Sequence, residues 1–386
     1  MTPTVQNPLL EIQQSAQAVF MPYGEAAELV ESFGEYEAEY AAIRKGVAIF
    51  DMPQRGLIPV RGTGRQSFLQ AMLTNDVGDQ KLGTGAACRA FLLNKQGRIE
   101  ADMVVANFQD DTSYLVLDRA DAARVSQELD KYLFTEDAQL EDASETHHHL
   151  ALHGPEAEKL IEHVADKPVA ALEPNQCDQV EIAGHKCLRL RHDETLSVGL
   201  HLLVPADSAI SVYQQLAEAI GGLVPQVEGG TRRNITGRGI GWLAYNTARI
   251  EAGKPIYHVD FGPDTLAHET GVLHEAVSFT KGCYLGQEIV ARMENLGHPK
   301  RILVALKCAD DRLPIAGTQV LDADDSAVVI GAVTSSTLSP MLGNTAIALA
   351  MVKWGKHRPD TEVKVAAEGE LVPAKAQQLA ELITPS

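Results

Sequence analysis

The segment Lys281-Gly282-Cys283-Tyr284-Leu285-Gly286-Gln287-Glu288 places one cysteine between two glycines and beside charged and amide side chains. Glycine adopts backbone angles that other residues avoid, so the chain can turn sharply around Cys283 and expose main-chain N–H groups there. A thiol in such a turn can ionise and act as a nucleophile, a metal ligand or a redox group. The alternative is a small, buried and inert cysteine, which is the usual state of a free cysteine.

The residues that follow the motif predict a helix. Ile289, Val290 and Met293 are separated by polar residues, a spacing typical of a short amphipathic helix that begins after Gly286. Cys283 would then lie close to a helix N-terminus. There the helix dipole and the Lys281 ammonium would both favour the thiolate over the thiol.

Composition and charge exclude several classes of protein. The chain has 386 residues, of which 45% are hydrophobic and 22% charged, so it can bury a large core and is not a disordered protein. The formal net charge of -19 and the lack of any basic stripe argue against a nucleic-acid partner. An anionic ligand would therefore need a local basic site.

Targeting signals and cysteine spacing favour a reduced, cytoplasmic protein. The first twenty residues have no basic start followed by an apolar run, and no apolar stretch approaches the roughly 18 residues that cross a bilayer. We therefore expect no membrane partner. The cysteines are odd in number and contain no CxxC pair, which argues against a cysteine-ligated zinc; they are Cys88, Cys177, Cys187, Cys283 and Cys308.

The run His147-His148-His149 opens an apolar stretch after an acidic loop. In a strand the middle histidine would face away from its two neighbours. We therefore favour a solvated strand edge over a metal site for this run, and we predict no metal ligands in the chain.

The order of predicted elements favours an α+β fold. Residues 23–46 predict a helix, and the next part of the chain predicts strands and helices that form a lobe with an antiparallel sheet over about 45–150. A similar order of strands and helices recurs after about residue 150 and predicts a second lobe over 151–297. Short β-like runs after Lys300 predict a small barrel or sandwich, so we divide the chain into a region 1–297 and a C-terminal domain 298–386.

The cysteine motif resembles the signature of the YgfZ-like, folate-binding relatives of the glycine-cleavage T protein, a family implicated in maturing iron–sulfur proteins. Further segments resemble motifs of the same superfamily, in family order from about residue 45 to 365. They are Leu73-Thr74-Asn75-Asp76-Val77, Leu92-Leu93-Asn94 with Gly97 and Arg98, Arg249-Ile250-Glu251-Ala252-Gly253, and Gly331-Ala332-Val333-Thr334-Ser335.

The resemblance implies a multi-lobed aminomethyltransferase-like fold around a central opening for tetrahydrofolate, with a C-terminal β-barrel. A pterin ring needs a carboxylate and apolar walls, and the glutamate tail of a folate needs cations. Glu251 could accept the pterin N–H groups, while Arg249 could hold a carboxylate or orient Glu251. The alternative is an exposed pair on a helix whose side chains do not face each other. The predicted cofactor-binding residues are Asn75, Arg249, Glu251, Lys281, Gln287 and Glu288.

Members of the superfamily differ in chemistry. In the true aminomethyltransferase the resemblance implies an acidic pair on the strand after the glycine turn, and one carboxylate of this pair positions the folate nitrogen. Here the first position is Ala101, and only Asp102 remains. Alternate residues of a strand point to opposite faces, so the neighbour does not automatically replace the missing carboxylate. The transferase also lacks a cysteine like Cys283.

Three hypotheses follow. The first is a tetrahydrofolate-binding factor that assists the assembly or repair of iron–sulfur client proteins, in which Cys283 ligates iron or is reversibly oxidised and Gln287 and Glu288 hydrogen-bond around it. The second is a tetrahydrofolate-dependent one-carbon transferase that uses Asp102. The third is an interaction protein that has lost its ligand. The sequence leaves open whether the chain is an enzyme.

Overall fold

The computed structural model describes residues 7–24, 27–224 and 235–383. Contacts within it divide the chain into two compact units. Unit 1 comprises Met1–Gln70, Asp76–Arg89 and Met103–Tyr245, and unit 2 comprises Ala71–Asn75, Ala90–Asp102 and Asn246–Ser386. The chain therefore passes from one unit to the other five times, after residues 70, 75, 89, 102 and 245. These units divide the chain differently from the predicted lobes.

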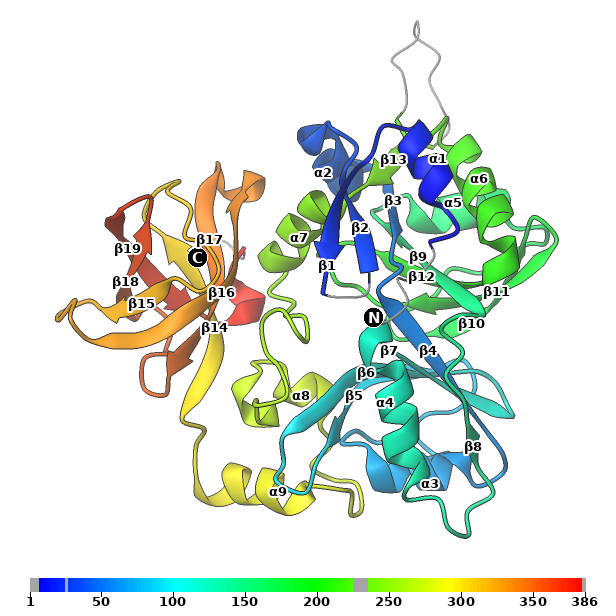
Figure 1. The fold of residues 1–386 in the computed structure, drawn as a ribbon, viewed down its shortest axis with the longest axis horizontal. Helices are drawn as coiled ribbons and strands as arrows, with labels where there is room; N and C mark the ends of the chain where they lie inside the picture. The colour runs from blue at the N-terminus through cyan, green and yellow to red at the C-terminus, as the bar shows by residue number, and fades with distance from the viewer. Residues whose placement is uncertain (1–6, 25–26, 225–234, 384–386) are drawn as a thin grey trace, which may run out of the picture. The chain divides into compact units, whose positions relative to one another are not determined.

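A six-stranded sheet in unit 1 has the strand order β10-β11-β12-β9-β3-β13 (Figure 1). Its pairs are antiparallel except β3 with β13, which are parallel. The strands are β3 Val47–Asp51, β9 His147–His153, β10 Cys177–Ile182, β11 His185–Arg191, β12 Gly199–Pro205 and β13 Gly237–Ile240.

Helices cover one face of this sheet. Alternate residues of β9, Leu150 and Leu152, join a buried cluster with Leu160 of α5 and Leu216 of α6. Full burial of each such side chain stabilises the fold by about 1.5–3 kcal/mol. The helices of unit 1 are α1 Leu10–Ser15, α2 Tyr36–Lys45, most of α3 Arg65–Met72, α4 Arg119–Asp130, α5 Ala157–Val164, η1 Ala206–Ser208 and α6 Ala209–Ala219.

A five-stranded sheet has the order β5-β6-β7-β4-β8. Its strands are β4 Arg55–Arg61, β5 Ala87–Leu93, β6 Ile99–Gln109, β7 Thr112–Asp118 and β8 Gln139–Leu140. Within unit 1, side chains of this sheet share a buried cluster with Cys177, Leu190 and Leu203 of β10 to β12. The six-stranded sheet is thus covered by helices on one face and by strands on the other.

The predicted helix over 23–46 is wrong in its first half. The structure has a hairpin of β1 Val19–Tyr23 and β2 Ala27–Ser32, and only α2 is helical. Leu29 and Val30 are both buried within β2, so apolar residues that suit a helix face are here buried from both sides of a strand.

Unit 2 holds the C-terminal barrel and several short helices. The barrel closes in the order β14-β17-β16-β15-β18-β19, so the predicted small β domain is confirmed as a barrel. Its strands are β14 Arg301–Cys308, β15 Gln319–Asp322, β16 Val329–Ser339, β17 Thr345–Lys353, β18 Glu362–Ala367 and β19 Glu370–Gln377. The helices are most of α7 Trp242–Glu251, then η2 Ala267–Glu269, α8 Leu273–Ala276, α9 Gln287–Leu296, η3 Pro340–Leu342 and η4 Leu379–Glu381.

No helix in the described part of the chain is long and apolar enough to span a membrane.

Candidate functional site

The turn around Cys283 is open to solvent. The Cys283 side chain is exposed, and the predicted helix is confirmed as α9, which begins directly after Gly286. Gly286 has a left-handed φ of 80°, and a Cβ at this position would lie 2.8 Å from the carbonyl oxygen of Asn94. Gly282 has an ordinary φ and no atom within 4 Å of its would-be Cβ. Only one of the two glycines is therefore required by the geometry.

Within unit 2, residues 71–75 anchor this turn. The Lys281 ammonium donates to the carbonyl oxygens of Leu73 and Asn75, each at 2.7 Å. The amide of Asn75 donates to the carbonyl oxygen of Glu275 at 3.0 Å. Two predicted site residues that are distant in sequence, Asn75 and Lys281, are thus in direct contact. The Lys281 ammonium satisfies main-chain carbonyls here, which gives it a structural part.

The other cysteines differ from Cys283 in burial. Burial raises the pKa of the Cys177 and Cys187 thiols to about 12 and that of Cys308 to about 11. Cys88 is half-buried. Since the thiolate is the reactive form, the three buried thiols are poor nucleophiles and Cys283 is the accessible one. Of the residues that follow it, Gln287 is half-buried and Glu288 is exposed.

Arg249 lies fully buried on α7. Its Nη1 pairs with the Asp260 carboxylate, which is also fully buried, and its Nε donates to Oδ1 of Asn246 at 2.9 Å. The main-chain N–H of Ile256 also donates to Asp260, at 2.9 Å. Nη2 of Arg249 is a buried donor without a hydrogen-bond partner among the described residues. The guanidinium is thus held on one side and has an unused donor on the other.

Glu251 is also buried, with 1% of its surface exposed. Its carboxylate accepts hydrogen bonds from the Ser339 hydroxyl and from the main-chain N–H of Met341, the latter at 3.4 Å. The alternative of an exposed helical pair is therefore wrong for Arg249 and Glu251. Their contact with a folate stays a prediction.

Asp102 lies on β6 in the part that belongs to unit 2. Its side chain is half-buried, whereas that of Ala101 is completely buried. The Tyr257 hydroxyl fixes this strand by donating to the carbonyl oxygens of Ile99 at 3.1 Å and Glu100 at 3.2 Å. The strand therefore turns Asp102, and not position 101, away from the interior.

The interpretation of the histidine run as a solvated strand edge is wrong. Strand β9 lies between β12 and β3, and His148 and His149 are only 4% and 3% exposed. The predicted alternation is confirmed, because Nε2 of His148 contacts Oδ1 of Asp51 at 2.6 Å while Nε2 of His149 contacts Nδ1 of His201 at 2.9 Å. The residues around the run, Leu150 and Leu152 included, make β9 a core strand.

The face of β9 that carries His149 assembles a polar cluster which the sequence interpretation missed. In the antiparallel register His153 is opposite Gly199 and Ala151 is opposite His201, so His201 is the diagonal neighbour of His149 and His153. Its ring centroid lies 5.1 Å from that of His149 and 5.8 Å from that of His153. A signal did exist: His149 and His153 are four residues apart, which places them on one face of a strand.

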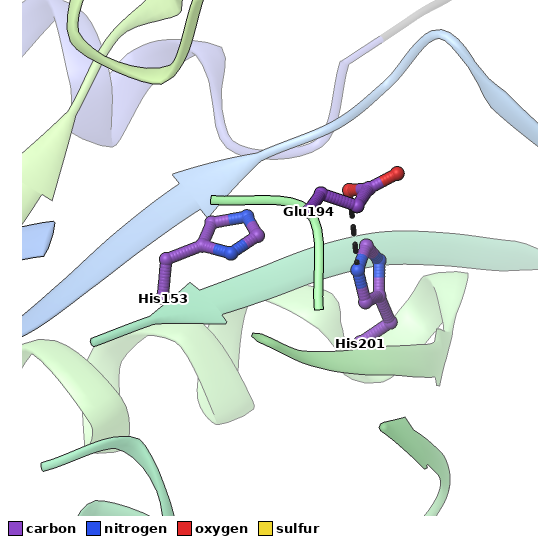
Figure 2. A group of neighbouring side chains, drawn as sticks. All are labelled: His153, Glu194 and His201. Carbon is purple, nitrogen blue, oxygen red and sulfur yellow. Dashed lines mark ion pairs between the residues drawn. The ribbon is translucent and has the colours of Figure 1, made fainter. Parts of the chain in front are cut away.

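Glu194 completes this cluster from the loop between β11 and β12. Oε2 of Glu194 lies 3.4 Å from Nε2 of His201 and accepts a hydrogen bond from the Tyr245 hydroxyl at 3.0 Å. Figure 2 shows His153, Glu194 and His201 converging from these elements. Burial alone would raise the pKa of Glu194, but the hydrogen bond and charge of His201, with His192 and Arg55, lower it well below its usual range.

His153 is the histidine of the cluster whose two ring nitrogens are both unsatisfied among the described residues. Its side chain is completely buried. Burial, reinforced by His201, lowers the pKa of His153 to about 3. The ring is therefore neutral near neutral pH and offers a lone pair.

Comparison with protein families assigns the chain. The model of the GCVT N-terminal domain matches residues 9–281, and that of the glycine cleavage T-protein C-terminal barrel domain matches residues 301–380. The chain therefore belongs to the glycine cleavage T-protein family. The fold, mixed α and β with a six-stranded C-terminal barrel, is that of an aminomethyltransferase.

Similar proteins cover almost the whole chain. An aminomethyltransferase of Geobacillus kaustophilus is 29% identical over 95% of this chain and 96% of its own, and one of Staphylococcus carnosus is 26% identical over 96% of both. The crystal structure of the glycine cleavage system aminomethyltransferase T from Bartonella henselae has a TM-score of 0.83 at 24% identity, covering 97% of this chain and 96% of that one. These relatives favour the one-carbon transferase hypothesis over the iron–sulfur one.

Proposed function

We propose that this chain is a tetrahydrofolate-dependent one-carbon transferase of the aminomethyltransferase type. Curated relatives that carry this name align along nearly their full length. The observation that carries the proposal is the position of Asp102, which retains a carboxylate on the outward side of β6.

The loss of the acidic partner at position 101 is compatible with this activity. Ala101 is completely buried, so a carboxylate in its place would face the interior and would need a protein partner there. Asp102 is half-buried and is the more accessible residue of the two. Its carboxylate can accept a hydrogen bond from a folate nitrogen and orient that nitrogen toward an aminomethyl group.

The residues of unit 2 also fit a folate. Tetrahydrofolate supplies the nitrogen that accepts the one-carbon unit. Nη2 of Arg249 is a buried donor in need of an acceptor, which a pterin carbonyl or a folate carboxylate would provide. Asp260 fixes the other side of the guanidinium, so its direction is set before a ligand arrives.

The test is formation of methylene-tetrahydrofolate and ammonia from tetrahydrofolate and an aminomethyl donor. We expect turnover by the full chain and a loss of about 100-fold or more in kcat for Asp102→Asn, with tetrahydrofolate binding retained in calorimetry. Glu100→Gln is the matched control, because it makes the same change of charge on the same face of the same strand. Tetrahydrofolate binding without product from any donor would refute the transferase and leave a binding role.

A second candidate function is favoured by Cys283. This thiol is exposed in a turn that is anchored by Lys281, as a group that contacts iron or undergoes reversible oxidation requires. We propose as the alternative that the chain belongs to the YgfZ-like branch and assists the assembly or repair of iron–sulfur client proteins.

This alternative is tested by complementation in cells that lack the native protein. Cys283→Ala should retain tetrahydrofolate affinity and lose the ability to sustain iron–sulfur enzymes. Cys88→Ala, a half-buried thiol, is the control and should complement. Full complementation by Cys283→Ala would remove the thiol from the function.

A further inference from the structure

We propose that His153, Glu194 and His201 bind one divalent first-row transition metal ion, for which Zn²⁺ is the best fit. The three side chains come from the end of β9, from the loop before β12 and from β12 itself, all within unit 1 (Figure 2). Each offers one ligand atom, and these atoms all lie within 4.8 Å of one another.

The buried ring nitrogens of His153 have no hydrogen-bond partner among the described residues, which points to a missing ligand. Within the same described part of the chain, Nε2 of His201 faces only the Glu194 carboxylate, at 3.4 Å; the side chains of His153 and His201 are 0% and 4–5% exposed. A buried polar group that is left unsatisfied costs about 1–3 kcal/mol. The ring of His153 is packed among other rings, with the Tyr245 centroid 5.4 Å and the His201 centroid 5.8 Å away. An ion between the two histidines would use a His153 nitrogen that now has no partner among the described residues and the His201 nitrogen that faces Glu194.

The donor set selects the class of metal. Two imidazole nitrogens and one carboxylate oxygen suit Zn²⁺ and neighbouring transition ions, whereas Ca²⁺ and Mg²⁺ prefer oxygen ligands alone. Zinc bonds of about 2.0–2.2 Å place tetrahedral ligands about 3.4 Å apart. The observed limit of 4.8 Å therefore requires each side chain to move inward by less than about 1 Å.

Neighbouring residues orient two of the ligands. Nδ1 of His201 contacts Nε2 of His149 at 2.9 Å, and when it donates there the lone pair of His201 is on Nε2, the atom that faces Glu194. The Tyr245 hydroxyl donates to Oε2 of Glu194 at 3.0 Å, which directs the carboxylate. Second partners of this kind are typical of metal-binding histidines and carboxylates.

Gly199 gives His153 its space. A Cβ at this position would lie 2.4 Å from the carbonyl oxygen of His192 and 3.3 Å from Nδ1 of His153. The absence of a side chain therefore keeps Nδ1 clear at the point where β12 begins. The rival explanation is a purely structural network in which Glu194 pairs with His201 and His192 and no ion binds.

The experiment titrates Co²⁺ and Zn²⁺ into the full chain, prepared without a histidine tag and stripped with a chelator. An excess of Mg²⁺ is present throughout, because the net charge of -19 attracts cations to exposed carboxylates. We expect one Co²⁺ per chain with a visible d–d absorption band, displacement by one Zn²⁺ and a rise in Tm with the metal. A folded chain that shows neither the band nor displacement would overturn the proposal.

Variants locate the ion. His153→Gln and Glu194→Gln should each weaken Co²⁺ binding about 100-fold or more, since each removes a direct ligand. Glu194 is 20% exposed, so its variant tests the site even if His153→Gln fails to fold. The control His163→Ala removes an exposed histidine of α5 and should leave the band intact. Equal binding by the wild type and Glu194→Gln would place the ion elsewhere and refute the site.

Discussion

At the scale of single residues, Gly286 is required where Gly282 is not. Gly286→Ala puts a Cβ into a left-handed backbone and against the carbonyl oxygen of Asn94, so we expect it to lower the free energy of unfolding by about 1–3 kcal/mol. Gly282→Ala, four residues earlier in the same turn, should change it by less than about 0.5 kcal/mol. Urea denaturation measures both, and equal losses would show that the turn is not held by the backbone of Gly286.

The thiols should separate by reactivity. At pH 8 we expect iodoacetamide to modify Cys283 rapidly, while Cys177 and Cys187 stay unmodified because a pKa of about 12 leaves few of their groups as thiolate. Raising the pH to 9 should increase the thiolate fraction of Cys177 and Cys187 only in proportion to the fall in proton concentration, because pH 9 is still below the pKa of both thiols. Peptide mass spectrometry counts the adducts. Fast labelling of Cys177 in the folded Cys283→Ser variant would contradict the raised pKa.

What could be predicted of the sites depended on distance along the chain. The turn at Cys283 and the helix after it follow from neighbouring residues, because glycine and amphipathic spacing act locally. The cluster of His153, Glu194 and His201 depends on the register between β9 and β12, which no local pattern encodes. The histidine run lies in a strand, as its alternation predicts. Its burial does not follow from the local sequence, because the position of a strand within a sheet is a property of the whole fold.

At the scale of elements, the buried ion pair of Arg249 and Asp260 links α7 to the loop that follows it. Removal of one partner leaves an uncompensated buried charge, so Asp260→Ala should lower the free energy of unfolding by about 3–5 kcal/mol. Glu370→Gln is the control in the same unit, since it disrupts the pair of Arg312 with a carboxylate that is 71% exposed. That change should cost less than about 1 kcal/mol. Similar urea midpoints for the two variants would refute a stabilising role for the Arg249–Asp260 pair.

Elements with strong local signals were predicted well. The strands of the C-terminal barrel lie after Lys300, where short β-like runs predict them, and α9 begins after Gly286, as the amphipathic spacing predicts. The exception is the hairpin of β1 and β2, whose apolar residues fit a helix and a strand equally. The pairing of the two strands decided this case.

At the scale of the whole molecule, the core of unit 2 uses residues from widely separated parts of the chain. Phe91, Leu93 and Ile99 are completely buried in one cluster with barrel residues such as Leu303 and Leu349. A fragment of residues 246–386 lacks these three side chains, each worth about 2–5 kcal/mol when truncated in a core. We therefore expect the fragment to bind a hydrophobic dye and to unfold without a cooperative transition, in contrast to the full chain. A sharp melting transition of the isolated fragment would contradict this expectation.

The chain crosses between its two units five times, and this limits how recombination can exchange its parts. A genetic recombination event with a single breakpoint exchanges one contiguous stretch of sequence, and no such stretch contains one unit complete without part of the other. A chimaera joined at residue 245 would take unit 1 from one parent, but its unit 2 core would pack Phe91, Leu93 and Ile99 of that parent against the barrel of the other.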